Sequence, residues 1–137
     1  MSAARGGSFV ELAYHAPELA VLEAFREVEE ALRNEYQRIF PNAKRHDLHT
    51  MLKAFRDRQV LEPGVGELFR NLMELRNFSA HGKAGRISPA EALEYRALCQ
   101  RFLEAMRAGL ARFTDAAQVI PKAIASDSRV IPGSLQG

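Results

Sequence analysis

The sequence predicts an all-α fold, an up-and-down bundle of four helices or at most five. Apolar residues recur every three or four positions along most of the chain, and no segment of five or more residues alternates apolar and polar side chains as a strand would. The composition, 47% hydrophobic and 26% charged over 137 residues, is that of a single globular domain. Helices with one apolar face each can bury those faces only against one another, so a bundle follows.

The first predicted helix begins near Pro17 and ends at Pro41. Pro17 suits the first turn because its φ is already fixed near the helical value, whereas Pro41 cannot continue the helix. The apolar residues between them are spaced by three or four: Leu22, Phe25, Val28, Leu32, Tyr36 and Ile39. A shorter helix is expected over residues 46–59, before Pro63 and Gly64 interrupt the pattern.

The third helix is expected over residues 65–81, with Gly82 in the position of a left-handed C-terminal cap. The fourth helix has the clearest start signal in the chain. Ser88 offers a hydroxyl N-cap, Pro89 occupies the first helical position, and Glu91 places a carboxylate three residues after the cap. Its apolar stripe predicts a helix that continues to residue 113.

The two ends of the chain fall outside this helical domain, which covers residues 17–113. Residues 1–16 are expected to be a flexible arm or a cloning remnant, since glycine and serine stand where a signal peptide would have an apolar stretch. Residues 114–137 are expected to form an extended or disordered tail, because the helical period is lost and prolines and serines interrupt it. No run of 18 apolar residues is present, so no membrane-spanning helix is predicted.

The cysteine and charge content limit the expected cellular location and the expected partners of the chain. Cys99 is the single cysteine, so no internal disulfide can form and a cytoplasmic location is expected. Its place beside the apolar stripe of the fourth helix predicts a buried, unreactive thiol. The net charge is +2, with acidic and basic residues interleaved, which permits a nucleic-acid partner without requiring one.

No cofactor and no metal site are predicted. The chain has neither a His-Glu-x-x-His nor a Cys-x-x-Cys sequence, and no glycine-rich loop follows a strand. His46 and His49 are three residues apart and could share a metal ion, but nothing nearby is an obvious third ligand. A zinc-dependent activity is therefore the least expected of the alternative functions.

The end of the third helix carries the residues with the most chemical potential. On a helical wheel Arg76 lies within about 40° of the middle of the apolar stripe, whereas Asn77 and His81 share another face. Burying the guanidinium unpaired would cost several kcal/mol, so Arg76 must meet a carboxylate, a helix C-terminus or an incoming anion. His81 lies in the last turn, where the negative end of the helix dipole favours the protonated ring.

An arginine that holds a phosphate beside a histidine that moves a proton is the minimum needed to cleave RNA without a metal, because the 2′-hydroxyl of the substrate supplies the nucleophile. The Arg–His spacing alone is weak evidence, since a chain of this composition contains it about once by chance. The alternative is structural. In that case Arg76 extends along the edge of the core and His81 merely ends a helix.

The residues around Arg76 also resemble a known superfamily. Residues 75–82 read LRNFSAHG, and residues 87–92, before the long fourth helix, read ISPAEA. This pattern is similar to the HEPN superfamily, in particular to HEPN-like bacterial domains of unassigned function. The similarity extends over residues 17–113, and its most specific part is Arg76-Asn77 with His81.

The resemblance implies a small helical bundle that forms a homodimer, with the Arg and His of both protomers facing each other in one composite site. In active members this site is a metal-independent endoribonuclease that leaves a 2′,3′-cyclic phosphate, in toxin, phage-defence or RNA-processing settings. Carried over to this chain, His81 would be the general acid or base, Arg76 the phosphate clamp, and Asn77 the residue that orients one of them. Lys83 and Arg86 would attract the RNA backbone, or else are solvated loop charges.

A second function stays open at this point. HEPN-like domains also include inactive scaffolds that bind RNA or a protein partner, and no motif separates them from the nucleases. Such a non-catalytic dimerisation or interaction module would use Arg76 and His81 structurally. Some members are regulated through a tyrosine two positions beyond the histidine, and Lys83 in that place argues against this form of regulation here.

Overall fold

The computed structural model describes residues 2–44, 46–80 and 87–127. These residues form helices and connecting loops, with no strand among them, which confirms the predicted all-α class. The helices, in order, are α1 (Ser2–His15), α2 (Pro17–Ile39), α3 (Leu48–Asp57), α4 (Pro63–Ala80) and α5 (Pro89–Asp127). No helix in the described ranges is both long enough and apolar enough to span a membrane.

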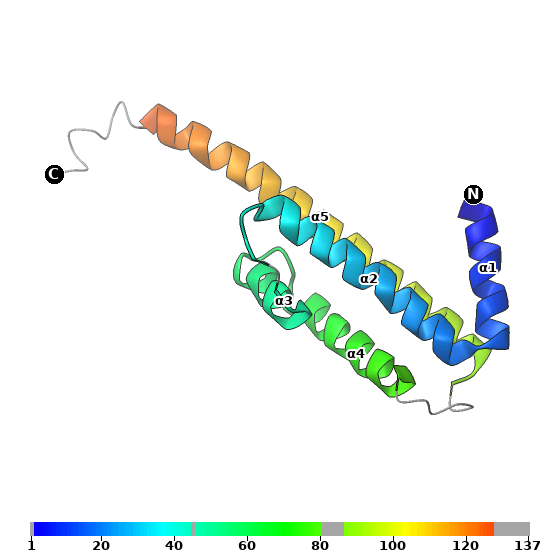
Figure 1. The fold of residues 1–137 in the computed structure, drawn as a ribbon. Helices are drawn as coiled ribbons and strands as arrows, with labels where there is room; N and C mark the ends of the chain where they lie inside the picture. The colour runs from blue at the N-terminus through cyan, green and yellow to red at the C-terminus, as the bar shows by residue number, and fades with distance from the viewer. Residues whose placement is uncertain (1, 45, 81–86, 128–137) are drawn as a thin grey trace.

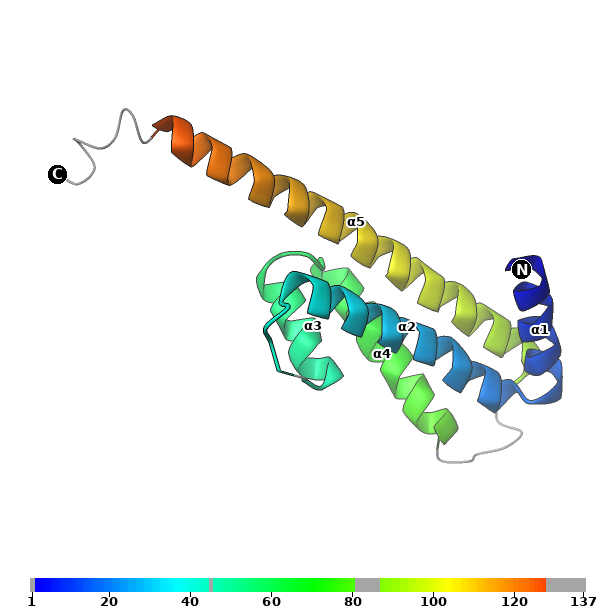
Figure 2. The ribbon, with the colours of Figure 1, turned by 45° about the horizontal axis from the view of Figure 1, so that its top comes forward.

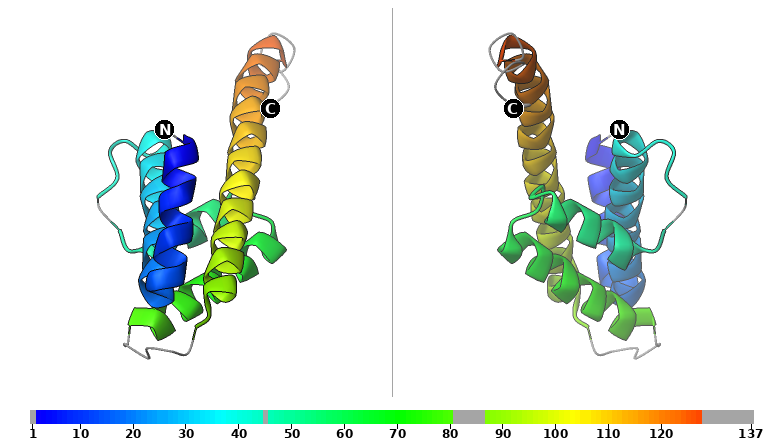
Figure 3. Two further views of the ribbon diagram at one scale, coloured as in Figure 1. Left: turned by 90° about the vertical axis from the view of Figure 1, so that its right-hand side faces the viewer. Right: turned by 90° about the vertical axis from the view of Figure 1, so that its left-hand side faces the viewer.

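The bundle is built around α2. This helix lies beside α5 along most of its length (Figures 1 and 2), and of the described helices it alone contacts all the others. The two views in Figure 3 place α1 on one side of the α2–α5 pair and place α3 and α4 toward the other side. The side chains that face inward from α2 are therefore the ones around which the remaining helices assemble.

Three phenylalanines join the central helices. Phe25 of α2 and Phe69 of α4 have ring centroids 5.6 Å apart, and Phe69 lies 5.2 Å from Phe102 of α5, in tilted arrangements. All three side chains are almost completely buried. Each aromatic pair adds about 0.5–1.5 kcal/mol to the stabilisation from burial itself, so this row links α2, α4 and α5 within the core.

The helix starts follow the predicted capping chemistry. The Ser88 Oγ accepts a hydrogen bond from the Glu91 backbone N–H at 3.1 Å, and a Glu91 carboxylate oxygen accepts one from the Ser88 N–H at 2.9 Å. α2 starts at Pro17 and ends at Ile39, as the prolines indicated. The cap of α3 was not predicted. There Asp47 accepts a hydrogen bond from the Thr50 N–H at 2.8 Å, so the helix begins at Leu48.

Both chain ends differ from expectation. The predicted flexible arm over residues 1–16 contains α1, because Phe9 and Ala13, four residues apart, are buried against the bundle. The predicted tail from residue 114 is helical as far as Asp127, since alanine, glutamine and lysine in this stretch are good helix formers. The part of the tail over residues 128–137 lies outside the described residues.

Cys99 lies in the core, as its position in the sequence predicted. The side chain is buried and forms no disulfide. Burial, the largest influence, raises the pKa of the Cys99 thiol to about 12. The thiol is therefore protonated, and unreactive as a nucleophile, throughout the physiological pH range.

A close approach fixes α5 against the linker between α3 and α4. Gly109 of α5 is buried, and a Cβ atom at this position would overlap the carbonyl oxygen of Val60. By contrast, a Cβ atom at Gly64, in the first turn of α4, would meet nothing within 4 Å. Only the first of these glycines is required by its surroundings.

Gly109→Ala is expected to lower the free energy of unfolding by about 1–3 kcal/mol, because the linker backbone must move to admit the methyl group. Gly64→Ala is the matched control and should raise it by roughly 0.4–1 kcal/mol through the lower entropy of the unfolded chain. Urea unfolding followed by circular dichroism measures both. Equal effects of the two substitutions would contradict the close approach.

The buried Cys99 thiol should react at least about 100-fold more slowly with Ellman's reagent at pH 8 than an exposed cysteine on the same helix. Ala97→Cys supplies that comparison, since Ala97 is exposed two residues earlier on α5. The difference should vanish in denaturant. A native Cys99 that reacts as fast as the introduced thiol would show that the core at this level of α5 is open.

Candidate functional site

Arg76 lies near the C-terminal end of α4, at the edge of the aromatic core. Its guanidinium carbon is 5.7 Å from the ring centroid of Phe25, the buried α2 residue that also contacts Phe69. The Arg76 Nη1 donates a hydrogen bond to the Asn77 side-chain oxygen at 3.0 Å. The ring face and the amide oxygen together hold the guanidinium in one place.

No acid within the described part of the chain offsets the charge of Arg76. No carboxylate within the described residues forms an ion pair with it, although other arginines of the bundle pair with a glutamate on their own helix. The sequence left three partners open for this guanidinium: a carboxylate, a helix C-terminus or an anion. Within the described residues the guanidinium has no carboxylate partner and donates one hydrogen bond, to the Asn77 side-chain oxygen.

Tyr95 brings a second polar group to this end of the bundle. Its hydroxyl donates a hydrogen bond to the Leu72 carbonyl at 2.7 Å, linking α5 to α4 within the core. Burial raises the pKa of Tyr95 well above its ordinary value, and the nearby positive charge of Arg76 acts in the opposite direction. The phenol is thus neutral, and it lies within electrostatic reach of the guanidinium.

Ser79 adds an unsatisfied hydroxyl. The residue is 3% exposed and lies three residues, about one helical turn, after Arg76 on α4. Its Oγ has no hydrogen-bond partner in the part of the chain that the structure describes. A buried hydroxyl without a hydrogen-bond partner lowers the free energy of unfolding by about 1–3 kcal/mol, so Ser79 destabilises the fold.

A cavity of about 230 Å³ lies between the end of α4 and the start of α5, with Tyr95 in its wall. Leu75 and Phe78 line it from α4, and Tyr95 and Leu98 line it from α5. Two glutamates of α5 also border it, Glu91 in the capping box and Glu94. The cavity is therefore lined by apolar side chains from both helices and by two acidic side chains from α5.

The predicted site residues divide into two groups. Arg76 and Asn77 are brought together directly, through their hydrogen bond. His81, Lys83 and Arg86 lie outside the described residues, in the segment 81–86 that follows α4.

The two polar groups of Tyr95 and Ser79 were missed by sequence reasoning. Tyr95 falls among the apolar residues of the fourth predicted helix. The signal that could have found its role is a tyrosine where phenylalanine would fill the same space, because a buried hydroxyl needs a partner. Ser79 had no such signal, since serine is common near helix ends.

Within the described residues, His46 and His49 do not form part of a cluster that could bind a metal ion. His46 precedes α3, where its backbone carbonyl accepts a hydrogen bond from Arg33 at 2.8 Å and its ring meets the Tyr36 ring edge-on. Over the described ranges, no three His, Cys, Asp or Glu side chains lie close enough together to hold a metal ion.

The comparisons with known proteins give one match. A family model described as a domain of unknown function, DUF4145, matches residues 10–125. No curated protein and no solved structure matches the chain. The match takes in all of α2, α3 and α4 together with Arg76 and Asn77. Because it spans most of the sequence, the chain belongs to the DUF4145 family.

Proposed function

We propose that this chain is a metal-independent endoribonuclease of the HEPN type, which acts as a homodimer with a composite site at the protomer interface. The proposal rests on the contacts of the Arg76 guanidinium. Its guanidinium is held by the Phe25 ring and the Asn77 amide, has no acidic partner among the described residues, and belongs to a residue five positions before His81. The resemblance of residues 75–82 to HEPN motifs supplies the reaction.

In this proposal Arg76 binds the scissile phosphate of an RNA strand. A guanidinium suits that role because its N–H groups match two phosphate oxygens at once and because it stays protonated at every physiological pH. Asn77 fixes the orientation of the guanidinium through its hydrogen bond to Nη1. A clamp held this way loses little conformational freedom when the phosphate binds, which favours stabilisation of the transition state.

His81 carries the proton transfer. Acting as general base, the imidazole accepts the proton of the ribose 2′-hydroxyl while the 2′-oxygen attacks the adjacent phosphorus. The bond from phosphorus to the 5′-oxygen breaks, and the leaving oxygen takes a proton from a general acid, for which the partner's copy of the same histidine is available in a composite site. The products are a 2′,3′-cyclic phosphate and a 5′-hydroxyl, with Arg76 neutralising the charge that develops on the phosphate.

Lys83 and Arg86 complete the proposed site as sequence-independent contacts to the RNA backbone. A toxin, defence or stress-response setting would require control of such an activity, for which a regulatory protein partner is the expected means. The cytoplasm, where RNA substrates are abundant, is the matching location.

A second candidate function is favoured by the apolar surface beside the motif. Leu98 is 36% exposed, and Leu75 and Phe78 are only partly buried around the cavity between α4 and α5. Two glutamates border the same cavity, and like-charge repulsion would disfavour an RNA backbone directly against it. A non-catalytic HEPN-like module that binds a protein partner would use this surface, with Arg76 in a structural role.

Cleavage of RNA in the presence of EDTA separates the two functions. Purified protein is expected to cut a labelled random-sequence RNA pool and to leave 2′,3′-cyclic phosphate ends. Arg76→Ala and His81→Ala should each reduce the rate at least about 100-fold, because each removes a group that acts on the transition state. Arg101→Ala removes the same type of charge from an exposed position on α5 and should leave the rate unchanged.

His81→Ala should also change the free energy of unfolding by less than about 1 kcal/mol, as expected for a residue that serves chemistry rather than the fold. If the wild type and His81→Ala leave the RNA equally intact, the ribonuclease proposal is wrong. The interaction module then becomes the favoured function.

The composite site makes activity depend on dimer formation. The cleavage rate per protomer should rise with protein concentration and level off once the dimer is saturated, because a monomer holds only half of the site. Sedimentation velocity over the same concentrations gives the fraction of dimer, which should track the rate. A constant rate per protomer from a species that sediments as a monomer would contradict the composite site.

A further inference from the structure

The cavity between the end of α4 and the start of α5, called the α4–α5 groove below, is lined by residues at helical spacing. They are Leu75 and Phe78 of α4, Glu91, Glu94, Tyr95 and Leu98 of α5, and Ile87 just before α5. The α5 residues extend about 10 Å along one face of that helix. The volume of about 230 Å³ is below the roughly 300–1,000 Å³ of cavities that hold small-molecule ligands, and it suits one large side chain of a partner.

Leu98 is an apolar residue at a position on α5 where a basic one would be favoured. It is 36% exposed. It follows Glu94 by four residues, the spacing at which a lysine or arginine would pair with that carboxylate. The leucine therefore leaves apolar surface open to water, and it leaves the neighbouring acid without a cation on the next turn.

The Glu94 carboxylate is exposed and has no ion pair with a described residue. One turn before it on α5 is Glu91, and two carboxylates at this spacing repel each other. Glu91 is accounted for by its capping bond to the Ser88 N–H. No such bond accounts for Glu94 in the part of the chain that the structure describes.

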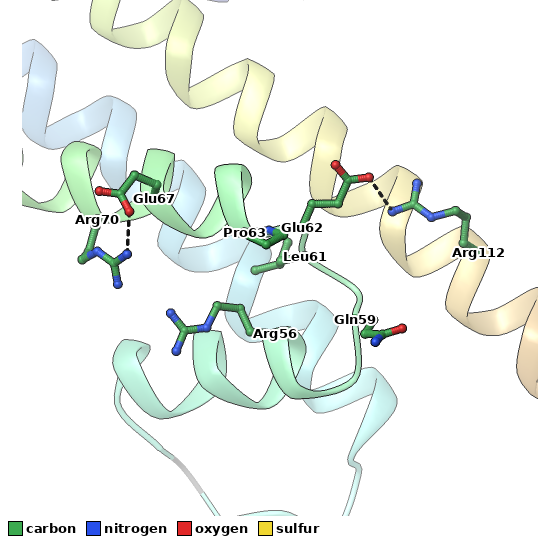
Figure 4. Close-up of a pocket in the computed structure, with 8 residues that line it drawn as sticks. All are labelled: Arg56, Gln59, Leu61, Glu62, Pro63, Glu67, Arg70 and Arg112. Carbon is green, nitrogen blue, oxygen red and sulfur yellow. Dashed lines mark hydrogen bonds and ion pairs between the residues drawn. The ribbon is translucent and has the colours of Figure 1, made fainter.

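The acidic residues of a larger cavity, of about 690 Å³ at the other end of α4, are paired within the chain (Figure 4). There Glu67 pairs with Arg70 at 2.7 Å, and Glu62 lies 3.8 Å from Arg112. The α4–α5 groove differs, since its lining contains acidic residues and no basic one among the described residues. A cation that neutralises this groove must therefore come from a partner.

We propose that the α4–α5 groove binds an amphipathic helix of a second protein, which inserts a large apolar side chain beside Leu98 and places a lysine or arginine against Glu94. A helix fits because two neighbouring helices form a groove into which the side-chain ridge of a third can pack. Addition of a strand would need an open sheet edge, and the described residues contain no strand. The inference rests on the second candidate function, whose partner it describes, and not on cleavage of RNA.

Repulsion between like charges argues against two other occupants. An RNA strand would bring its phosphates toward Glu91 and Glu94. A second copy of the chain, seated on the same groove across a two-fold axis, would bring a second pair of these acids to the same patch. A basic partner helix meets neither repulsion, and its charge complements the groove.

Fluorescence anisotropy of the full chain with two labelled peptides tests the groove at physiological ionic strength. Both peptides are amphipathic helices of about 20 residues with leucine along one face, and their flanks carry lysine in one and glutamate in the other. The lysine peptide should bind at least about tenfold more tightly. Glu94→Lys should weaken its binding about tenfold, whereas Glu104→Lys makes the same change at an exposed α5 position outside the groove and should not.

Leu98→Asp tests the apolar contact. The new carboxylate would attract the lysine peptide, so weaker binding, by about tenfold, reports the loss of the apolar contact rather than a change of charge. Ala108→Asp adds the same charge at an exposed α5 position outside the groove and should not weaken binding. Circular dichroism should show that both variants keep the fold.

The proposal is overturned if the wild type binds neither peptide or binds both equally, or if Leu98→Asp and Ala108→Asp bind the lysine peptide equally well. It is also overturned if Leu98→Asp converts a wild-type dimer into a monomer in sedimentation velocity, which would assign the groove to a second copy. Cleavage of RNA is measured separately from peptide binding, so failure of either proposed function is distinguished from failure of this inference.

Discussion

The arrangement of the whole bundle depends on the contact of Phe25 with Phe69, and through it with Phe102. These rings join α2, α4 and α5 at one level, and α2 is the helix on which the others pack. The same ring also contacts Arg76, because the guanidinium carbon lies 5.7 Å from the Phe25 ring centroid. The hydrophobic interior and the proposed phosphate clamp therefore share one side chain, and the position of the charge follows from the packing of the core.

Most of the fold could be predicted from the sequence because its helices are strongly amphipathic and their ends are chemically marked. Pro17 and the Ser88–Glu91 capping box define two helix starts that the structure reproduces. The N-terminal helix was missed because, among residues 8–15, where burial is described, Phe9 and Ala13 alone are buried, and two positions do not establish a period. The continuation of α5 was missed because proline and the loss of apolar residues were given more weight than helix propensity.

The candidate site was predictable only in part. The inward direction of Arg76 followed from the helical wheel, but its contact with Phe25 depends on the distance between two helices, which a sequence does not contain. The cavity of about 690 Å³ lined by Arg56 and Arg112 was not found from the sequence, because its residues come from the end of α3, the linker after it, the start of α4 and the middle of α5. Clusters formed by tertiary packing have no linear pattern, whereas Arg76 and Asn77 are neighbours in the chain.

Phe25 packs in the core against Phe69 and also contacts the Arg76 guanidinium, and both contacts limit the substitutions that this position accepts. A substitution that repacks the interior at this residue would also tilt the platform beneath the guanidinium, so gains in stability and losses in anion recognition would be inherited together. Variation at Phe25 is constrained twice over, whereas Phe102, on the far side of the aromatic row, is constrained by packing alone. A substitution at Phe102 is therefore limited by the packing of the core, and one at Phe25 is limited by that packing and by the position of the guanidinium as well.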